Sequence, residues 1–234
     1  MTTSNVASSL LLLQLMDSSF PVGTFAHSYG LEQSVRDRRV TDAVGVEGFV
    51  QSVLSMQVAT TDARALAGAH EAARLADIGE VMRVDRELYA TKGTSELRDA
   101  STSTGRRLLQ EVLAHPEVSH DLIATYLDTV ERDDAPGTHA VALGVVGAAL
   151  EVPATELVAA MLFSTANTLH QAAMRLLPVS HRDAQAALHR HRAEIPALAD
   201  DVNSEGGPDF ASFLPKQEIA SMRHEGAGVR FFAS

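Results

Sequence analysis

The chain contains no cysteine, so it forms no disulfide and offers no thiolate ligand to a metal. This absence is compatible with the cytoplasmic location that we expect. No stretch approaches the roughly 18 consecutive apolar residues that a membrane span needs, and the best candidate is the short run AVALGVVGAAL. The N-terminal run SSLLLLQLM lacks the basic region and the small-residue cleavage site of a signal peptide, so we interpret it as a core helix.

Basic residues are also few. The chain has 19 lysines and arginines against 30 aspartates and glutamates, a formal net charge of −11. A broad basic face that neutralises phosphates is therefore not expected, and nucleic acid is not a predicted partner. Apolar residues make up 45% and charged residues 21%, which is typical of a globular protein with a real core rather than of a disordered chain.

The apolar spacing is helical along nearly the whole chain, and no alternating run of β-branched and aromatic residues predicts a strand. The predicted fold class is all-α, a single-domain helical bundle of about ten helices. Asp42, Thr138 and Ser180 stand where an N-cap side chain would accept hydrogen bonds from the first turn. The predicted helices span residues 5–17, 28–38, 42–60, 61–76, 78–91, 94–114, 118–132, 138–150, 153–177, 180–194 and 215–223.

The domain prediction has two parts. Residues 1–199 form the helical bundle, and residues 200–234 form an acidic, glycine-rich connection and a C-terminal docking segment of the same domain. The closing VRFFAS places arginine and two phenylalanines after the glycine-containing EGAG. Arginine and aromatic residues are the usual anchors of interfaces, so this tail is predicted to dock on a partner. The alternative is that both phenylalanines fold back onto their own bundle.

Glycines inside two predicted helices need a reason. Each interior glycine costs about 1 kcal/mol of helix propensity, so Gly144 and Gly147 in THAVALGVVGAALEV predict that something approaches that stripe closely. Gly105 in STSTGRRLLQEVL marks a close helix crossing, or else precedes two arginines that simply lie on a solvated helix face. The helix over 153–177 is apolar on more than one face and is predicted to be the central helix.

Ten histidines require a test for a metal site. His189 and His191 lie about 200° apart on a helix, and His181 lies two turns from His189, so neither pair can share one ion. We therefore predict no metal site in the chain. The sequence also has no P-loop pattern and no nucleophile elbow. We predict that it is not an enzyme.

Four segments in order resemble the urease accessory protein UreF family: LLQLMDSSFPVGTFAHSYGLEQSV, TSTGRRLL, THAVALGVVGAALEV followed by LLPVSHRDAQAAL, and ASMRHEGAGVRFFAS. The resemblance spans nearly the whole chain. It implies a non-catalytic chaperone of urease maturation, a homodimer that binds UreD (also called UreH), recruits the GTPase UreG and serves nickel insertion into apo-urease. Nickel, and GTP on the partner, are implied for the assembled complex, with no cofactor bound tightly by this chain.

The resemblance implies binding residues rather than catalytic ones. In PVSHRDAQ, His181 and Ala184 replace the glutamine and glycine of the family's usual turn, while Pro178, Asp183 and Gln185 are retained. Residues predicted to pack helices closely are Gly105, His139, Gly144 and Gly147. Residues predicted to bind partners are Pro21, Gly23, Phe25, His27, Ser28, Tyr29, Glu32, Arg106, His224, Glu225, Arg230, Phe231, Phe232 and Ser234.

Three alternatives stay open at this point. The chain could be a small-ligand receptor or enzyme with a pocket near His27, Tyr29 and Glu32, or a purely structural subunit. Partner contact and core packing look the same from sequence at His27 and Tyr29. Arg106, Arg107 or Arg230 could act on the partner GTPase as an arginine finger, although we prefer docking.

Overall fold

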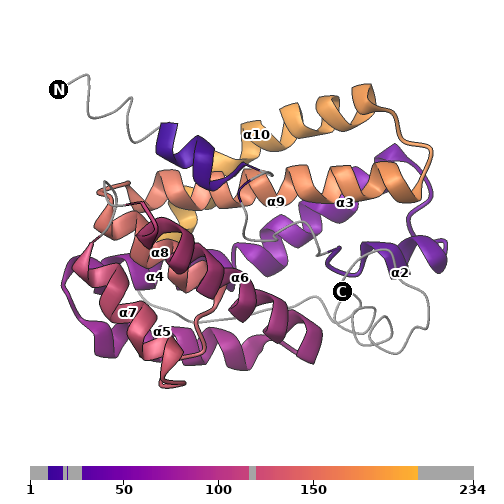
Figure 1. The fold of residues 1–234 in the computed structure, drawn as a ribbon. Coiled ribbons are helices and arrows are strands. Elements are labelled where there is room, and N and C mark those ends of the chain that lie inside the picture. The colour runs from indigo at the N-terminus through magenta and orange to yellow at the C-terminus, as the bar shows by residue number, and fades with distance from the viewer. Residues whose placement is uncertain (1–9, 18–19, 21–27, 116–119, 205–234) are drawn as a thin grey trace.

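The computed structural model describes residues 10–17, 20, 28–115 and 120–204. These residues contain helices and no strand, so the all-α prediction is confirmed. None of the helices in this part of the chain has the length and apolar character needed to cross a bilayer. After a helical segment over residues 10–15, the elements are α2 (Leu31–Arg36), α3 (Ala43–Val53), the π-helical η2 (Leu54–Val58), α4 (Asp62–Arg74), α5 (Ile78–Thr91), α6 (Ser95–Leu113), α7 (Asp121–Glu131), α8 (His139–Ala149), α9 (Ala154–Leu176) and α10 (His181–Ser204) (Figure 1).

Helix α10 is longer than predicted. The sequence predicts an end at residue 194, but the helix continues to Ser204 with Pro196 inside it. Proline removes one backbone hydrogen bond and costs about 3 kcal/mol in a helix interior. The helix persists because Ile195, Ala199 and Val202 continue a buried stripe beyond it. Residues 200–204 of the predicted connection therefore belong to α10, and the predicted helix 215–223 lies outside the described residues.

The helix caps follow the sequence at two of three positions. The Asp42 carboxylate accepts from the amide of Gly45 at 2.8 Å, and the Ser180 hydroxyl accepts from the amide of Asp183 at 3.1 Å. The prediction for Thr138 is wrong, because its side chain makes no cap hydrogen bond. Its hydroxyl instead donates to the carboxylate of Asp85 at 2.6 Å. The hydroxyl therefore donates to a distant carboxylate instead of accepting from a backbone amide of the first turn.

The helix at the centre of the bundle is α8 rather than α9. Every residue from Ala140 to Gly147 is buried. Helix α8 packs against α4, α5, α6, α7 and α9. The predicted central helix, α9, runs across the molecule beside α10 and also contacts α3 and α4 (Figure 1). A short helix of alanine, glycine and valine can be surrounded closely because its side chains are small.

Glycine sets how closely the backbones meet. A Cβ on Gly105 of α6 would lie 2.2 Å from the carbonyl oxygen of Gly137, just before α8. A Cβ on Gly144 would lie 2.5 Å from the carbonyl oxygen of Leu66 on α4. At Gly147, the nearest atom is a side-chain methyl of Leu157, at 2.3 Å. Backbone cannot move aside as a side chain can, so the first two contacts fix the spacing of α6 and α4 around α8.

Replacing Gly144 with alanine is expected to lower the free energy of unfolding by about 3 kcal/mol, because the new methyl meets backbone. Gly48→Ala on α3 is the matched control, since nothing lies within 4 Å of its Cβ position. That control should raise stability by up to about 1 kcal/mol through helix propensity. Urea denaturation followed by circular dichroism measures both, and equal effects would contradict the close crossing.

Two buried imidazoles meet where α9 packs on α10. The ring centroids of His170 and His191 are 5.4 Å apart, and both residues are almost fully buried. Burial, reinforced by the neighbouring His191, lowers the pKa of His170 to about 4. Glu47 on α3 opposes this shift, and Arg190 on α10 adds to it. Burial also lowers the pKa of His191, so both rings are neutral at pH 7.

Acid should weaken the fold through this pair. The pKa of His170 is about 4 in the folded chain and 6.5 in the unfolded chain, so the unfolded chain binds more protons between pH 4 and pH 6.5. The free energy of unfolding therefore decreases as the pH is lowered through this range. A loss of about 2 kcal/mol from pH 7 to pH 5 is expected from His170. His170→Leu should flatten the slope, whereas His189→Leu, at an exposed position of α10, should keep it. An unchanged slope in His170→Leu would place the acid sensitivity elsewhere.

Candidate functional site

The described chain forms a partly open cavity of about 130 Å³ where several helices converge. Its wall combines apolar side chains with hydroxyl, amide, imidazole and charged groups. The lining residues come from the N-terminal segment, η2, α4, α5, α6, α8 and α9: Leu15, Met16, Tyr29, Gln57, Val58, Thr61, Asp62, Thr91, Lys92, Gly93, Leu97, Ala100, Ser101, Thr104, His139, Met161, Ser164, Thr165 and Thr168.

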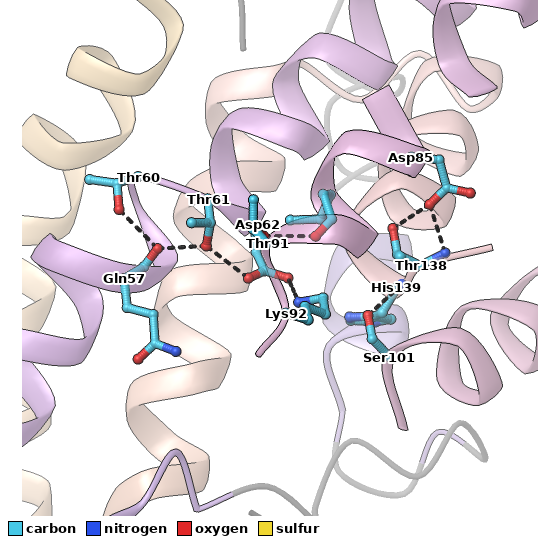
Figure 2. Close-up of polar contacts among 11 residues, drawn as sticks. Gln57, Thr60, Thr61, Asp62, Asp85, Thr91, Lys92, Ser101, Thr138 and His139 are labelled. Carbon is cyan, nitrogen blue, oxygen red and sulfur yellow. Dashed lines mark hydrogen bonds and ion pairs between the residues drawn. The ribbon is translucent and has the colours of Figure 1, made fainter. Parts of the chain in front are cut away.

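An ion pair forms one side of the cavity. Lys92 lies at the C-terminal end of α5, and Asp62 lies in the first turn of α4. The Lys92 ammonium donates a hydrogen bond to the Asp62 carboxylate at 2.8 Å (Figure 2). The side chains are 13% and 17% exposed. Burial acts to raise the pKa of Asp62, but the charge and hydrogen bond of Lys92 outweigh it and hold that pKa below its ordinary value. The positions also complement the dipoles of the two helices.

The π-helical turn is connected to this pair through Thr61, whose hydroxyl lies 3.1 Å from the Asp62 carboxylate. The amide of Ala59 donates to the carbonyl of Leu54, five residues earlier, which is the π-helical hydrogen bond. Gln57 lies in this turn, and its backbone carbonyl accepts from the hydroxyl of Thr61 at 2.7 Å (Figure 2). Gln57 lines the cavity, but its side-chain oxygen Oε1 is buried away from open space and has no hydrogen-bond partner among the described residues. Such an acceptor calls for a donor.

The N-terminal signature reaches the cavity through Tyr29. Tyr29 and Gly30 both have left-handed backbone, with φ of 49° and 78°, immediately before α2. Burial and the nearby Asp62 carboxylate raise the pKa of Tyr29, so its phenol stays neutral. Ser28 is fully buried. The buried carboxylate of Glu32 pairs with Arg36 at 2.6 Å, and Glu32 does not line the cavity.

His139 is positioned by a second buried carboxylate. Asp85 on α5 accepts four hydrogen bonds, from the Tyr126 phenol at 2.7 Å, the Gly137 amide at 2.7 Å, and the Thr138 amide and hydroxyl at 2.9 and 2.6 Å. Burial raises the pKa of Asp85, and these four donors oppose the shift. The turn they fix leads into α8, where the His139 amide donates to the Ser101 hydroxyl at 3.3 Å (Figure 2).

The remaining predicted residues divide into two sets. Arg106 is about half exposed on α6 and does not line the cavity. Its guanidinium lies 3.4 Å from the Val130 carbonyl and 4.0 Å from the Asp133 carboxylate.

Within the described ranges, no group of three or more histidine and acidic side chains could hold a metal ion. The other predicted partner-binding residues lie outside these ranges: Pro21, Gly23, Phe25, His27, His224, Glu225, Arg230, Phe231, Phe232 and Ser234.

Sequence reasoning missed the charged and amide groups of the cavity. Asp62 and Lys92 are 30 positions apart, and no local spacing connects them. Lys92 follows the last residue of α5, where its sequence TKGTS resembles an ordinary helix-breaking turn. The sequence signal that could have indicated this ion pair was an acidic residue in the first turn of one helix and a basic residue at the end of the next. Exposed helix ends show the same pattern, so it does not identify a buried pair.

The family model for UreF matches residues 40–192. This chain belongs to the UreF family. The urease accessory protein UreF 2 of Brucella canis is 33% identical over 223 residues, which are 95% of this chain and 90% of that protein. The UreF proteins of Arthrobacter sp. and Paenarthrobacter aurescens are 32% and 33% identical over 228 residues, covering 96% of this chain and 96% and 97% of theirs. The resemblance seen in the four motifs is therefore confirmed, and UreF similarity extends over nearly the whole chain.

Lys92→Met in this UreF chain is expected to lower the free energy of unfolding by about 2 kcal/mol, because it leaves the Asp62 carboxylate without its cation in a largely buried place. The double variant Asp62→Asn/Lys92→Met should recover part of the loss. Arg74→Met is the control, since its ion pair with Glu71 is more than 60% exposed on both sides and contributes under about 0.5 kcal/mol. Equal losses in Lys92→Met and Arg74→Met would show that the cavity pair is no different from a surface pair.

Proposed function

We propose that this chain is a non-catalytic urease accessory protein that binds UreD (UreH), recruits the GTPase UreG and supports nickel insertion into apo-urease. The observation that carries the proposal is its similarity, along 95% of its length, to a protein named urease accessory protein UreF 2. A cytoplasmic location and a homodimer are part of the proposal. Nickel is the cargo of the assembled complex, and GTP is bound by the partner.

The described part of the N-terminal signature suits a binding surface. Ser28 and Glu32 are buried, and the Glu32–Arg36 pair fixes the first turn of α2. The segment that precedes Ser28 in sequence is therefore attached to a rigid base. A rigid base supports affinity because little conformational entropy is lost when a partner binds.

Docking accounts for Arg106 better than an arginine finger does. Its guanidinium already contacts the Val130 carbonyl and lies near Asp133, both in or just after α7 of its own chain. A finger must enter the partner's nucleotide site and contact the transferring phosphate. We therefore propose that this chain controls UreG by holding it in the complex. A large rise in UreG turnover that Arg106→Ala abolishes would refute this.

Deleting the gene in a urease-positive host should abolish or strongly reduce urease activity in nickel-supplemented medium, because the metal centre is not assembled. Complementation with the full chain should restore it. A chain lacking residues 228–234 should fail to restore activity and should co-purify less UreD and UreG, while keeping the helical circular dichroism of the full chain. The tail carries the arginine and aromatic residues suited to an interface.

The matched control replaces residues 228–234 with a glycine–serine segment of equal length, which separates loss of side chains from loss of chain length. This control should behave like the truncation. Wild-type urease activity in the deletion strain would overturn the accessory role, and undiminished co-purification by the truncated chain would overturn docking through the tail.

A further inference from the structure

We propose that α10 is released from α9 and α3 at mildly acidic pH while the rest of the bundle stays folded, and that the buried His170–His191 pair is the trigger. The proposal rests on the geometry of this pair, on the unpartnered nitrogens of both rings, and on the place of α10 at the edge of the bundle. It does not depend on the accessory role, and its test needs no partner protein.

The two rings face each other without most of the hydrogen bonds that buried imidazoles need. Their centroids are 5.4 Å apart and their planes are inclined by 33°. Both nitrogens of His170 and Nε2 of His191 are buried and have no hydrogen-bond partner among the described residues. Nδ1 of His191 lies 3.2 Å from the side-chain oxygen of Gln51 on α3. A neutral imidazole has one donor and one acceptor nitrogen, so the unpartnered nitrogens make the docked position of α10 less stable than a satisfied pair would.

The charged groups that act on the pair come from α3 and α10. Glu47 on α3 favours protonation of both rings and Glu194 favours protonation of His191, whereas Arg190 on α10 opposes both. Among the described residues, α4 contributes no charge that shifts the pKa of either ring. The Arg190 guanidinium also donates to the Glu47 carboxylate at 2.6 Å and so joins α10 to α3. This hydrogen bond lowers the pKa of Glu47, so the α10–α3 ion pair persists at pH 5.5 and does not itself respond to mild acid.

Protonation of the rings favours the released helix. Burial is the main cause of the low pKa of both rings, which is about 4 for His170 and below 6.5 for His191. Release brings the rings into water, where each has its ordinary pKa of 6.5, so the released state binds more protons between pH 7 and pH 5.5. From His170 alone, the equilibrium constant for release should rise about eightfold over this range. His191 increases the rise further.

Helix α10 can leave without unfolding the helices around α8. It packs on α9, α4 and α3 at one edge of the molecule, whereas α8 is surrounded by α4, α5, α6, α7 and α9 (Figure 1). Three of the seven buried residues of α10 are alanines, which bury little apolar area, so this interface is a weak one. Since α10 leads directly into residues 205–234, its release also changes where the tail proposed to dock on partners is attached.

Amide hydrogen exchange of the full chain, measured by mass spectrometry of its peptides, separates release of α10 from global unfolding. Rates at pH 7 and pH 5.5 are divided by the intrinsic rates of the same unstructured peptides, which removes the pH dependence of the exchange chemistry. The opening equilibrium of α10 should rise at least about eightfold from pH 7 to pH 5.5, while α8 stays more protected than α10 at both values. Equal protection of α10 and α8 at both values, or an opening of α10 that does not change with pH, would overturn the proposal.

Variants assign the effect to the two rings. His170→Leu should reduce the rise to the part that His191 contributes, and His170→Leu/His191→Leu should remove it. His170→Gln keeps a polar side chain that does not titrate and should give the same reduction, so the test stands if the leucine variants do not fold. His189→Leu, at an exposed position of α10, is the matched control and should keep the full rise. A full rise in both His170→Gln and His170→Leu would assign the trigger to other groups and refute the role of the pair.

Discussion

The buried carboxylate of Asp85 is the interaction on which the packing of this bundle depends. It joins α5 to the Tyr126 phenol on α7 and to the turn that begins α8. A buried carboxylate is costly unless donors surround it, and the four donors here come from two separate parts of the chain. Because the donors assemble only when α7 and the turn are in place, the carboxylate selects one arrangement of α5, α7 and α8.

The start of α8 then sets the rest of the core. Helix α8 is buried on every side, so an error in its position would be felt by α4, α6 and α9 together. Gly105 and Gly144 allow backbone to touch backbone at two of these contacts. The same turn places His139 against Ser101 on the cavity wall. The cavity is thus bounded by elements whose spacing the buried core has already fixed, and it is therefore preorganised.

Local rules predicted the helices well because each depends on neighbours in sequence. Helix α5 begins and ends where its apolar period does, and the Asp42 and Ser180 caps need partners only three residues away. The errors have a common cause, which is long-range contact. Thr138 turns its hydroxyl to a carboxylate 53 positions away, and α10 passes through Pro196 because distant helices bury its final turns. The Asp62–Lys92 pair was invisible for the same reason, since periodicity identifies a helix but does not identify its neighbours.

The signature before α2 shows how far a motif can be interpreted. Gly30 has left-handed backbone at the N-cap of α2. Tyr29 shares that conformation, which costs a residue with a side chain on the order of 1 kcal/mol. Buried Ser28 and the Glu32–Arg36 pair hold the segment on both sides of Tyr29, and the phenol lies on the cavity wall. Strain of this kind persists only where the surroundings over-determine it. Tyr29 therefore connects the rigid base of the signature to the cavity.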